Sequence, residues 1–409
     1  MITNQAYRYE LKANNKQRGL LLKHCGVARF AWNWALARRI ELYKTHEGKE
    51  RVTTAITQHK ELNSLKRLEY PWMYEVSKCA PQEALRDLDR AYANFYRGCK
   101  NHENIGKPKF KKKGINDSFR LTGAVTLGEK LIQLPRIGKI RAKESTAKFS
   151  GRILSATVSR EADRWFCSLC VEAEKLESQS IQGDVVGIDL GLNSFAVISD
   201  GKEYKHIEAP KPLKKRLKKL QRLSRQQSRK QKKSQNRKKA NLALARYYRK
   251  IRNIRKDFLS KLTTKLAKTK PAIIIEDLAV KNMIRNRHLA RSIADVGWGE
   301  FRRMLKYKTL WYGSRLVVIG RFEPTSKTCS DCGAINKELT LSDRTWVCMS
   351  CGVVHDRDEN AAKNIRSLGI KQLDTESYSG INACGVSVRP VVTRAVHDEA
   401  GSKRVCNER

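Results

Sequence analysis

The 409-residue sequence is short of acidic residues: 41 Asp and Glu stand against 84 Lys and Arg, which leaves a formal charge of +43. It contains no apolar run near the roughly 20 residues that cross a bilayer, and residues 1–11 lack the apolar core of a signal peptide. These absences argue against a membrane-spanning or secreted protein and predict a cytoplasmic one. The charge needs a polyanion to neutralise it, with nucleic acid the first candidate and an acidic membrane surface the second.

Acidic residues are missing altogether between residues 211 and 256, where 21 Lys and Arg occur. Leucine and isoleucine keep a helical spacing through this segment, which predicts two long amphipathic helices around a polar elbow at residues 226–236. Without acidic residues to form ion pairs along a helix, these helices repel themselves unless a polyanion is bound. The segment therefore favours nucleic-acid binding over an ordinary solvated surface.

The eleven cysteines are not arranged as a disulfide framework, because their number is odd and four of them form one cluster. Two Cys-x2-Cys pairs are separated by fifteen residues, and a glycine follows each pair directly. This spacing is typical of a four-thiolate zinc ribbon, in which no coordination position stays open, so the predicted zinc is structural. The predicted ligands are Cys329, Cys332, Cys348 and Cys351.

Cys167 and Cys170 have a similar spacing but are predicted to be ordinary thiols. Three positions apart on an expected strand, they face opposite sides, and no second pair lies nearby in the sequence.

Carboxylates stand where buried strands and a helix begin or end. Asp189 lies inside the first of two apolar runs in residues 185–200, and Glu276 ends the apolar run that starts at Pro271. Asp358 is in the first turn of a late helix, which Asp356 caps together with Glu359 three residues further on. A charge in a core strand is costly unless it is paired. Oxygen ligands of this kind suit Mg²⁺ or Mn²⁺, and two such ions about 3.5–4 Å apart can clamp a phosphodiester for hydrolysis.

Other acids and one histidine are weaker candidates. Asp295 lies in a glycine-rich stretch and Glu300 opens a helix that closes at Gly313, so neither ends a strand. His355 is a conceivable catalytic helper, although a single histidine beside a zinc ribbon is more often a supporting or surface residue.

The N-terminal part predicts a strand at residues 6–11, a helix from Lys16, and strands within 125–140 and 153–171. A second helix is expected from Ser77 to Tyr96, with Lys78 and Gln82 on one face near its start. Glutamine can read adenine and lysine can reach guanine or phosphate, but a plain solvated surface is the more common explanation of such a pair taken alone. A basic link follows at residues 106–113.

Taken together, these segments resemble the split RuvC nuclease motifs of the TnpB family, insertion-sequence proteins related to type V CRISPR effectors. The resemblance rests on VGIDLG at 186–191, IIEDL at 274–278, the four-cysteine ribbon and DRDENAA at 356–362. It extends over nearly the whole chain, through residues 29–33, 106–113 and 295–299.

The resemblance implies a multidomain α+β protein: an RNase H-like (RuvC) α/β nuclease core with a helical insert and a zinc ribbon, preceded by a β-barrel wedge domain with a helical recognition insert. The expected domains are the wedge at 1–15 and 114–180, the recognition domain with its basic link at 16–113, the split nuclease at 183–325 and 355–370 with the insert 211–266, the ribbon at 326–354, and a disordered tail at 371–409.

It also implies an RNA-guided DNA endonuclease that uses a transposon-derived guide RNA and recognises a short motif beside its double-stranded DNA target. The acids matching Asp189, Glu276 and Asp358 would bind the catalytic metals. The expected assembly is a monomer bound to one RNA, and a dimer is not excluded. The expected location is the prokaryotic cytoplasm, in association with the nucleoid. Further nucleic-acid contacts are expected at Lys78, Gln82, Thr122, Arg216, Arg222 and Arg225.

Two other functions stay open at this stage. A nuclease-silent RNA-guided repressor would bind its target without cutting, although the intact acids argue against it. A transposase would itself join DNA ends through a nucleophilic tyrosine or serine, or by strand transfer, and the tyrosine content does not exclude this.

Overall fold

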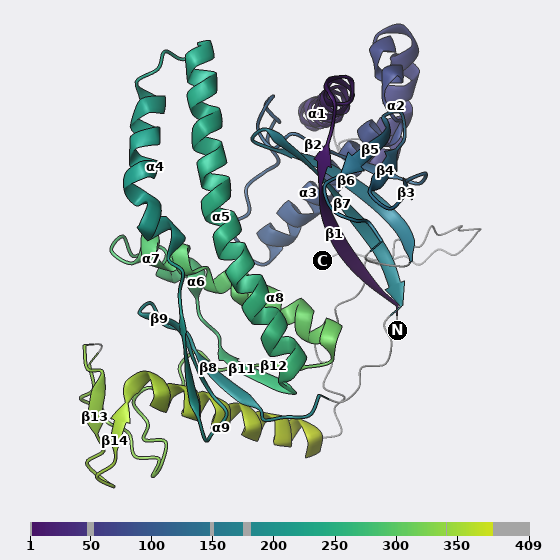
Figure 1. Cartoon of the computed structure of the whole chain (residues 1–409). Coiled ribbons are helices and arrows are strands. Elements are labelled where there is room, and N and C mark those ends of the chain that lie inside the picture. Colours follow the sequence, from purple (N-terminus) through teal and green to yellow (C-terminus); the bar gives the residue numbers. More distant parts are fainter. Residues whose placement is uncertain (1, 47–52, 148–150, 175–180, 341, 379–409) are drawn as a thin grey trace. The chain divides into compact units, whose positions relative to one another are not determined.

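A computed structural model of the chain describes residues 2–46, 53–147, 151–174, 181–340 and 342–378 (Figure 1). The chain divides into two compact units. The first comprises Met1–Ser180, Pro210–Leu262 and Ala294–Gly297, and the second comprises Ile181–Ala209, Thr263–Ile293 and Trp298–Arg409. In the described part of the chain, no helix has the length and apolar character needed to cross a membrane.

The first unit is built on a seven-stranded antiparallel sheet in the order β2-β6-β7-β1-β5-β4-β3. The expected hairpin within 153–171 is present, and its turn uses Ala162 at a φ of 56°. The segment 125–140 is split into three short strands. The strands are β1 (Ile2–Lys12), β2 (Ser118–Thr122), β3 (Thr126–Leu127), β4 (Leu131–Leu134), β5 (Gly138–Ala142), β6 (Arg152–Glu161) and β7 (Arg164–Glu174).

Cys167 and Cys170 both lie on β7, where Cys167 is buried and Cys170 is half-buried. They lie on opposite faces of the strand, as expected for two separate thiols.

Helices share one apolar core with this sheet. The first begins with a capping box, in which Asn14 accepts a hydrogen bond from the backbone N–H of Gln17 and Gln17 bonds back to Asn14. The third helix carries Pro81 in its first turn, where a missing N–H costs no hydrogen bond. The elements are α1 (Asn15–Thr45), α2 (Ala55–Leu68), the 3-10 helix η2 (Pro71–Glu75) and α3 (Cys79–Lys100).

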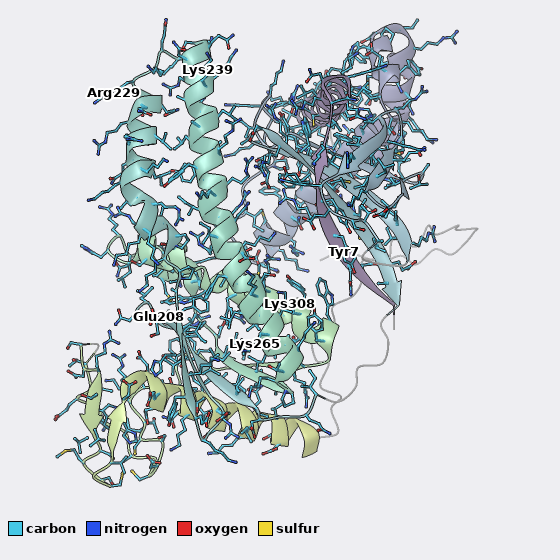
Figure 2. The ribbon with its side chains drawn as sticks, in the orientation of Figure 1. Tyr7, Glu208, Arg229, Lys239, Lys265 and Lys308 are labelled. Carbon is cyan, nitrogen blue, oxygen red and sulfur yellow. The ribbon has the colours of Figure 1, made fainter. Side chains whose placement is uncertain are left out.

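The acid-free segment forms the two predicted helices, α4 (Pro212–Ser228) and α5 (Gln235–Thr269). Figure 2 shows Arg229 and Lys239 near the tip where one helix passes into the other. The buried Asp295 accepts hydrogen bonds from the N–H groups of Leu213 (3.0 Å) and Lys214 (2.9 Å) at the start of α4. It also pairs with Arg255 at 3.2 Å, so this acid has a structural role as a helix cap.

The second unit contains a five-stranded sheet in the order β10-β9-β8-β11-β12. β11 runs parallel to β8 and to β12, whereas β9 is antiparallel to β8 and β10. This order, with a leading hairpin followed by parallel strands, is the RNase H-like core that was expected. The strands are β8 (Val186–Asp189), β9 (Ser194–Ser199), β10 (Tyr204–Glu208), β11 (Ala272–Glu276) and β12 (Arg315–Ile319).

The long helix α9 (Arg357–Tyr378) lies along this sheet and contacts β8, β9, β11 and β12 (Figure 1). Two glycines permit the close approach. A Cβ on Gly187 of β8 would lie 2.2 Å from the carbonyl oxygen of Ala362, and one on Gly369 of α9 would lie 2.4 Å from Ile274. The helix α8 (Trp298–Tyr312) also packs on this sheet, where Phe301 meets Phe195 of β9 edge to face.

Smaller elements complete the second unit: α6 (Val280–Met283) and the short ribbon strands β13 (Thr345–Val347) and β14 (Val354–Asp356). One further helix, α7 (Ala290–Val296), spans the boundary between the two units. The tail predicted to start at residue 371 was placed too early, because α9 continues to Tyr378; residues 379–409 lie outside the described part of the chain.

Candidate active site

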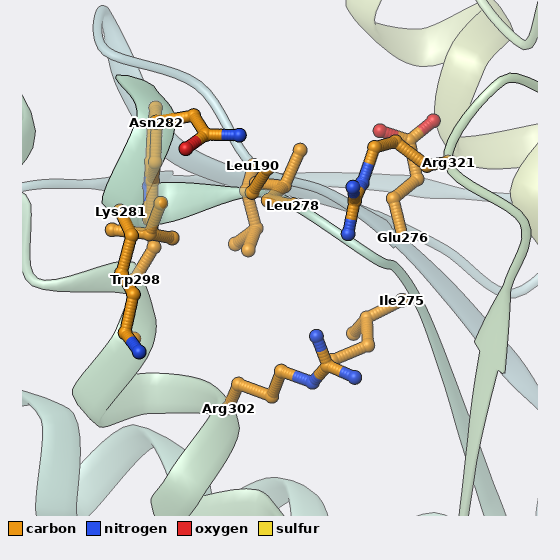
Figure 3. Close-up of a pocket in the computed structure, with 12 residues that line it drawn as sticks. Leu190, Ile275, Glu276, Leu278, Lys281, Asn282, Trp298, Arg302 and Arg321 are labelled. Carbon is orange, nitrogen blue, oxygen red and sulfur yellow. The ribbon is translucent and has the colours of Figure 1, made fainter. Parts of the chain in front are cut away.

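Asp189 and Glu276 end neighbouring parallel strands. Ile188 of β8 is paired with Ile275 of β11, so the acid that follows each isoleucine lies at the same edge of the sheet. In open α/β sheets this carboxyl edge is where functional groups gather. The residues that precede the acids in both strands are apolar and buried, whereas Asp189 and Glu276 themselves are half-buried. Figure 3 shows Glu276 next to Ile275.

The third acid, Asp358, approaches the same edge from α9. Asp356 caps this helix through its Oδ1, which accepts hydrogen bonds from the N–H groups of Asp358 (2.9 Å) and Glu359 (3.0 Å), as the sequence predicted. The cap leaves the Asp358 carboxylate free for another role. An arginine that the sequence did not suggest, Arg344, lies 3.7 Å from Asp358 and supplies a counter-charge.

Electrostatics show that the three acids share one environment. Burial raises the pKa of Asp189 to about 7, and the negative charges of Glu276 and Asp358 add to this rise, while Arg357 acts in the opposite direction. Burial also raises the pKa of Glu276. Carboxylates from three separate elements thus repel one another, and a cation placed among them would relieve that repulsion.

Thr325 is the direct partner of Glu276, and no pattern in the sequence indicates it. The buried Thr325 hydroxyl donates to Glu276 Oε1 at 2.6 Å. The carbonyl oxygen of Thr325 in turn accepts hydrogen bonds from the side-chain amides of Asn360 (3.3 Å) and Asn364 (2.8 Å) on α9. The helix that carries Asp358 therefore also holds the partner of Glu276. The sequence does contain a signal for the two asparagines: their four-residue spacing places both on one face of the helix.

The donor set fits a divalent cation of the Mg²⁺ or Mn²⁺ kind, since it consists of carboxylate oxygens only. In the described residues, the potential ligand groups whose atoms all lie within 4.8 Å of one another are the four ribbon cysteines and the set Cys329, Asp331 and His355. The three carboxylates are spread more widely than that.

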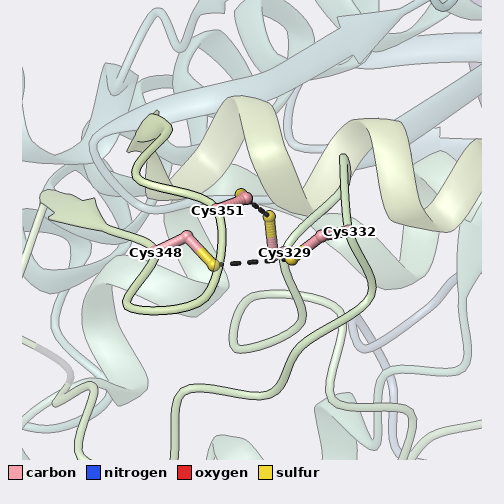
Figure 4. Close-up of side chains that lie close together, drawn as sticks. All are labelled: Cys329, Cys332, Cys348 and Cys351. Atoms are coloured by element: carbon pink, nitrogen blue, oxygen red, sulfur yellow. Dashed lines mark hydrogen bonds between the residues drawn. The ribbon is translucent and has the colours of Figure 1, made fainter.

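The ribbon cysteines come together as the spacing predicted (Figure 4). Cys329 Sγ lies 3.7 Å from Cys351 Sγ, and Cys332 Sγ lies 3.6 Å from Cys348 Sγ. Zinc–sulfur bonds of about 2.3 Å in a tetrahedron put the sulfurs about 3.8 Å apart, so the cluster has the size of a zinc site. Backbone N–H groups of Cys351 and Ser350 lower the pKa of Cys348 to about 6, which favours the thiolate that a metal needs.

His355 is buried against the ribbon. Its Nε2 lies 3.0 Å from Cys329 Sγ, and its ring packs against that of Trp346 with centroids 4.8 Å apart. The side chain thus contacts the cysteine cluster, which is the supporting role considered from the sequence. Its neighbour Asp356 begins the cap of α9.

The residues considered for reading a DNA motif gather at the start of α3. Lys78 is exposed beside the helix start, and Gln82 follows in the first turn. The buried Cys79 donates from Sγ to the carbonyl oxygen of Thr122 at 3.3 Å, which joins this helix start to the end of β2. Of the three predicted contacts, Lys78 is exposed and Gln82 and Thr122 are half-buried, and all three stay predictions.

On α4, Arg222 and Arg225 are exposed and Arg216 is half-buried. All three stay predicted nucleic-acid contacts.

A core sheet whose central parallel strands end in carboxylates, followed by a four-cysteine ribbon, is a fold of the RNase H-like, RuvC type. Comparison with known proteins identifies the family. Residues 168–287 match a family described as "Probable transposase", and residues 298–365 match one described as "Cas12f1-like, TNB domain". Together with two relatives that match nearly the whole chain at 34–35% identity, these matches show that the chain belongs to the TnpB family.

Relatives of nearly full length support this membership. A "Putative RNA-guided DNA endonuclease" of Streptomyces pristinaespiralis is 35% identical over 391 residues, which cover 94% of this chain and 92% of the relative. A protein of the same description from Escherichia coli, InsQ, is 34% identical over 383 residues, covering 89% of this chain and 92% of the relative.

The fold has a solved counterpart in the Cas12f1 protein of a complex with sgRNA and target DNA. The two chains are 16% identical with a TM-score of 0.50, over 86% of this chain and 82% of that one.

Residues 1–49 match a family described as "Helix-turn-helix domain". The described part of that segment forms strand β1 followed by the single long helix α1.

Proposed function

We propose that this chain is an RNA-guided DNA endonuclease that cuts phosphodiester bonds by metal-assisted hydrolysis at Asp189, Glu276 and Asp358. The carrying observation is geometric: parallel pairing of β8 with β11 brings Asp189 and Glu276 to one edge of the sheet, where the charge of Asp358 also acts on Asp189. Carboxylates from three separate elements at one edge are a suitable donor set for a divalent cation.

The chain's own residues hold this site in three ways. Parallel pairing of β8 and β11 brings Asp189 and Glu276 to one edge. Thr325 fixes the orientation of Glu276 by donating to Oε1. The Asp356 cap orients the first turn of α9 and so presents Asp358. Bound Mg²⁺ or Mn²⁺ would supply a polarised phosphate oxygen and an activated water.

The proposed partners are a guide RNA and double-stranded target DNA. The formal charge of +43 and the acid-free segment 211–256 supply the backbone neutralisation that a long RNA and a heteroduplex require. The names of the full-length relatives support guidance by RNA. Base pairing would then read the target, and Lys78, Gln82 and Thr122 would read a short motif beside it. The proposed assembly is one protein chain bound to one RNA. A dimer would be recognised because the complex would contain twice the protein mass.

The zinc ribbon is proposed as a structural element, with Zn²⁺ held by Cys329, Cys332, Cys348 and Cys351. Four thiolates fill the tetrahedron, so this metal has no position for substrate.

The test has two steps. RNA that copurifies with the protein is sequenced, and a plasmid library matching that RNA, with randomised flanks, is then assayed for cutting. Absence of a defined RNA would reject the proposal. Replacing any one acid, as in Asp189→Asn, Glu276→Gln or Asp358→Asn, should lower cutting on the order of 10³-fold with target binding retained. The exposed Asp374 on α9 provides the control, Asp374→Asn, which should cut normally.

A repressor would give a different result in the same assay. The wild-type protein would bind its matched target and leave it intact at every Mg²⁺ or Mn²⁺ concentration. A DNA-joining transposase would instead yield new covalent junctions, which sequencing of the products detects.

A further inference from the structure

The side chain of His24, on α1, is completely buried in the first unit and reaches the residue that precedes α3. Its Nε2 lies 3.1 Å from the backbone nitrogen of Ser77, which can only donate, so Nε2 is the acceptor of this hydrogen bond. The ring proton is therefore on Nδ1, which lies 2.8 Å from the carbonyl oxygen of Leu20 and donates to it. Burial lowers the pKa of His24 and so favours this neutral ring.

The hydrogen bond to His24 completes the cap of α3. Lys78 already has helical backbone angles (φ −54°, ψ −26°), and Ser77 caps this first turn, since its Oγ accepts from the N–H of Cys79 at 3.4 Å. In a capping box, a Glu or Gln three residues after the cap accepts the N–H of the cap residue. Here that position holds Ala80, and the imidazole of His24 on another helix accepts this N–H instead.

His24 also contacts β2, the third element at this place. Its ring packs against that of the buried Phe119 with centroids 4.9 Å apart. The strand β2 ends three residues later at Thr122, whose carbonyl oxygen accepts the hydrogen bond from Cys79 Sγ. One buried side chain thus joins α1, the start of α3 and β2, and the last two of these carry the predicted contacts to the flanking motif.

We propose that His24 is a positioning residue for recognition of the short motif beside the DNA target, because it fixes the start of α3, with Lys78 and Gln82, against the end of β2. The side chain itself is buried and does not touch nucleic acid. Reading a base edge depends on paired hydrogen bonds of about 2.9 Å, which a helix start that is free to shift cannot hold. This inference rests on the proposed reading of a flanking motif and adds the residue that makes the reading surface rigid.

The test measures motif preference through binding, so that it does not depend on cutting. RNA-bound protein is incubated without Mg²⁺ with a matched target library whose flanks are randomised, and the bound DNA is sequenced. His24→Leu removes the acceptor for the Ser77 N–H, and it should reduce the enrichment of favoured bases roughly five- to tenfold. His24→Gln presents an amide oxygen to the same N–H and should keep the enrichment within about twofold of wild type.

Leu36→Ala is the control for loss of stability alone. Leu36 is 1% exposed on the same helix, but it lies about 18 Å further along that helix than His24, at about 1.5 Å per residue. This variant should lower the melting temperature and leave the motif preference unchanged. Should His24→Leu not fold, Ser77→Pro removes the donor instead, with the same expected loss of preference. The preceding Val76 is extended (φ −116°, ψ 168°), as a residue before proline must be.

Three results would overturn the role of His24: a His24→Leu preference equal to that of wild type, an equal loss in His24→Gln, or an equal loss in Leu36→Ala. In each of them the wild-type preference remains, so the proposed motif reading survives. A wild-type protein that binds its matched target with no preference for any flank would overturn the motif reading and this inference with it.

Discussion

The Thr325 hydroxyl donates to Glu276 Oε1 at 2.6 Å, which leaves Oε2 as the oxygen free to face a cation. Because this bond lowers the pKa of Glu276 against the effect of burial, it favours the ionised form that a metal requires. Thr325 is thus a positioning residue for the proposed site. It lies just before the ribbon, and α9 holds its backbone through Asn360 and Asn364.

Thr325→Ala should therefore weaken cutting by roughly 10- to 100-fold, the range for a hydrogen bond to a charged group. The pKa of Glu276 should also rise, so the acidic limb of the pH–rate profile moves to higher pH. Thr325→Ser keeps the hydroxyl and serves as the control, with near-normal cutting. A Thr325→Ala profile that superimposes on wild type would show that the bond does not position Glu276.

Asp189 should make the stability of the Mg²⁺-free protein depend on pH. Its folded pKa of about 7 exceeds the unfolded value near 3.8, so between these values the folded state holds a proton that the unfolded state lacks. Stability should fall as pH rises toward about 7, by at most about 1.4 kcal/mol per pH unit from this group. Denaturant unfolding with zinc present, between pH 5.5 and 8, measures it.

The Asp189→Asn variant should have a flatter profile and exceed wild type in stability at pH 8. Adding Mg²⁺ at pH 8 should stabilise wild type and leave the variant nearly unaffected. If both proteins show the same pH dependence, the raised pKa of Asp189 does not contribute to the free energy of unfolding.

Zinc removal should unfold the ribbon and also abolish cutting. Asn360 on α9 accepts a hydrogen bond from the N–H of Ser330, next to Cys329, at 2.9 Å, so loss of the ribbon frees one side of the helix that carries Asp358. Cys332→Ser should lower the zinc content and cutting together, as measured by metal analysis and plasmid cleavage. Cys170→Ser, outside the cluster, should leave both unchanged. Full activity of zinc-free protein would separate the ribbon from the catalytic site.

Arg222 and Arg225, exposed on α4, should act by binding phosphates of the RNA. Replacing either by alanine should weaken RNA binding and reduce the slope of log K against log salt by about one for each phosphate that is no longer neutralised. Filter binding at several salt concentrations gives the slope. Lys371→Ala on α9 removes an equal charge from another exposed site, and its slope should equal that of wild type. Equal slopes for all variants would exclude α4 from the RNA-binding surface.

Gln82 should influence which flanking motif is accepted. Gln82→Ala should relax the preference at one motif position by roughly 1–3 kcal/mol, because glutamine can pair with adenine through two hydrogen bonds. Sequencing of the surviving plasmids in the randomised library measures the preference at each position. A uniform loss of cutting across all motifs would instead assign Gln82 to a phosphate or to the fold.

The two central strands of the second unit could be predicted from sequence because β8 and β11 are short, apolar and end abruptly in acids. Asp189 and Glu276 are recognisable for that reason, and the cysteine spacing identified the ribbon cluster. Helix α2 escaped prediction because its buried face includes Gln58 and Lys66 and so lacks apolar periodicity.

Residues that act through distant loops could not be predicted. Thr325 lies 49 positions from Glu276, and Asp295 caps α4 through the N–H of Leu213, 82 positions earlier. Neither residue belongs to a local pattern, so only the folded chain places them with their partners.

The packing of α9 against Gly187 has a consequence for biosynthesis. The helix that supplies the third carboxylate is the last described element of the chain, whereas β8, against which it packs, is made much earlier. A nascent chain still on the ribosome, or one ended early by a nonsense codon, therefore carries the basic helices α4 and α5 without Asp358, the third acid of the proposed catalytic site.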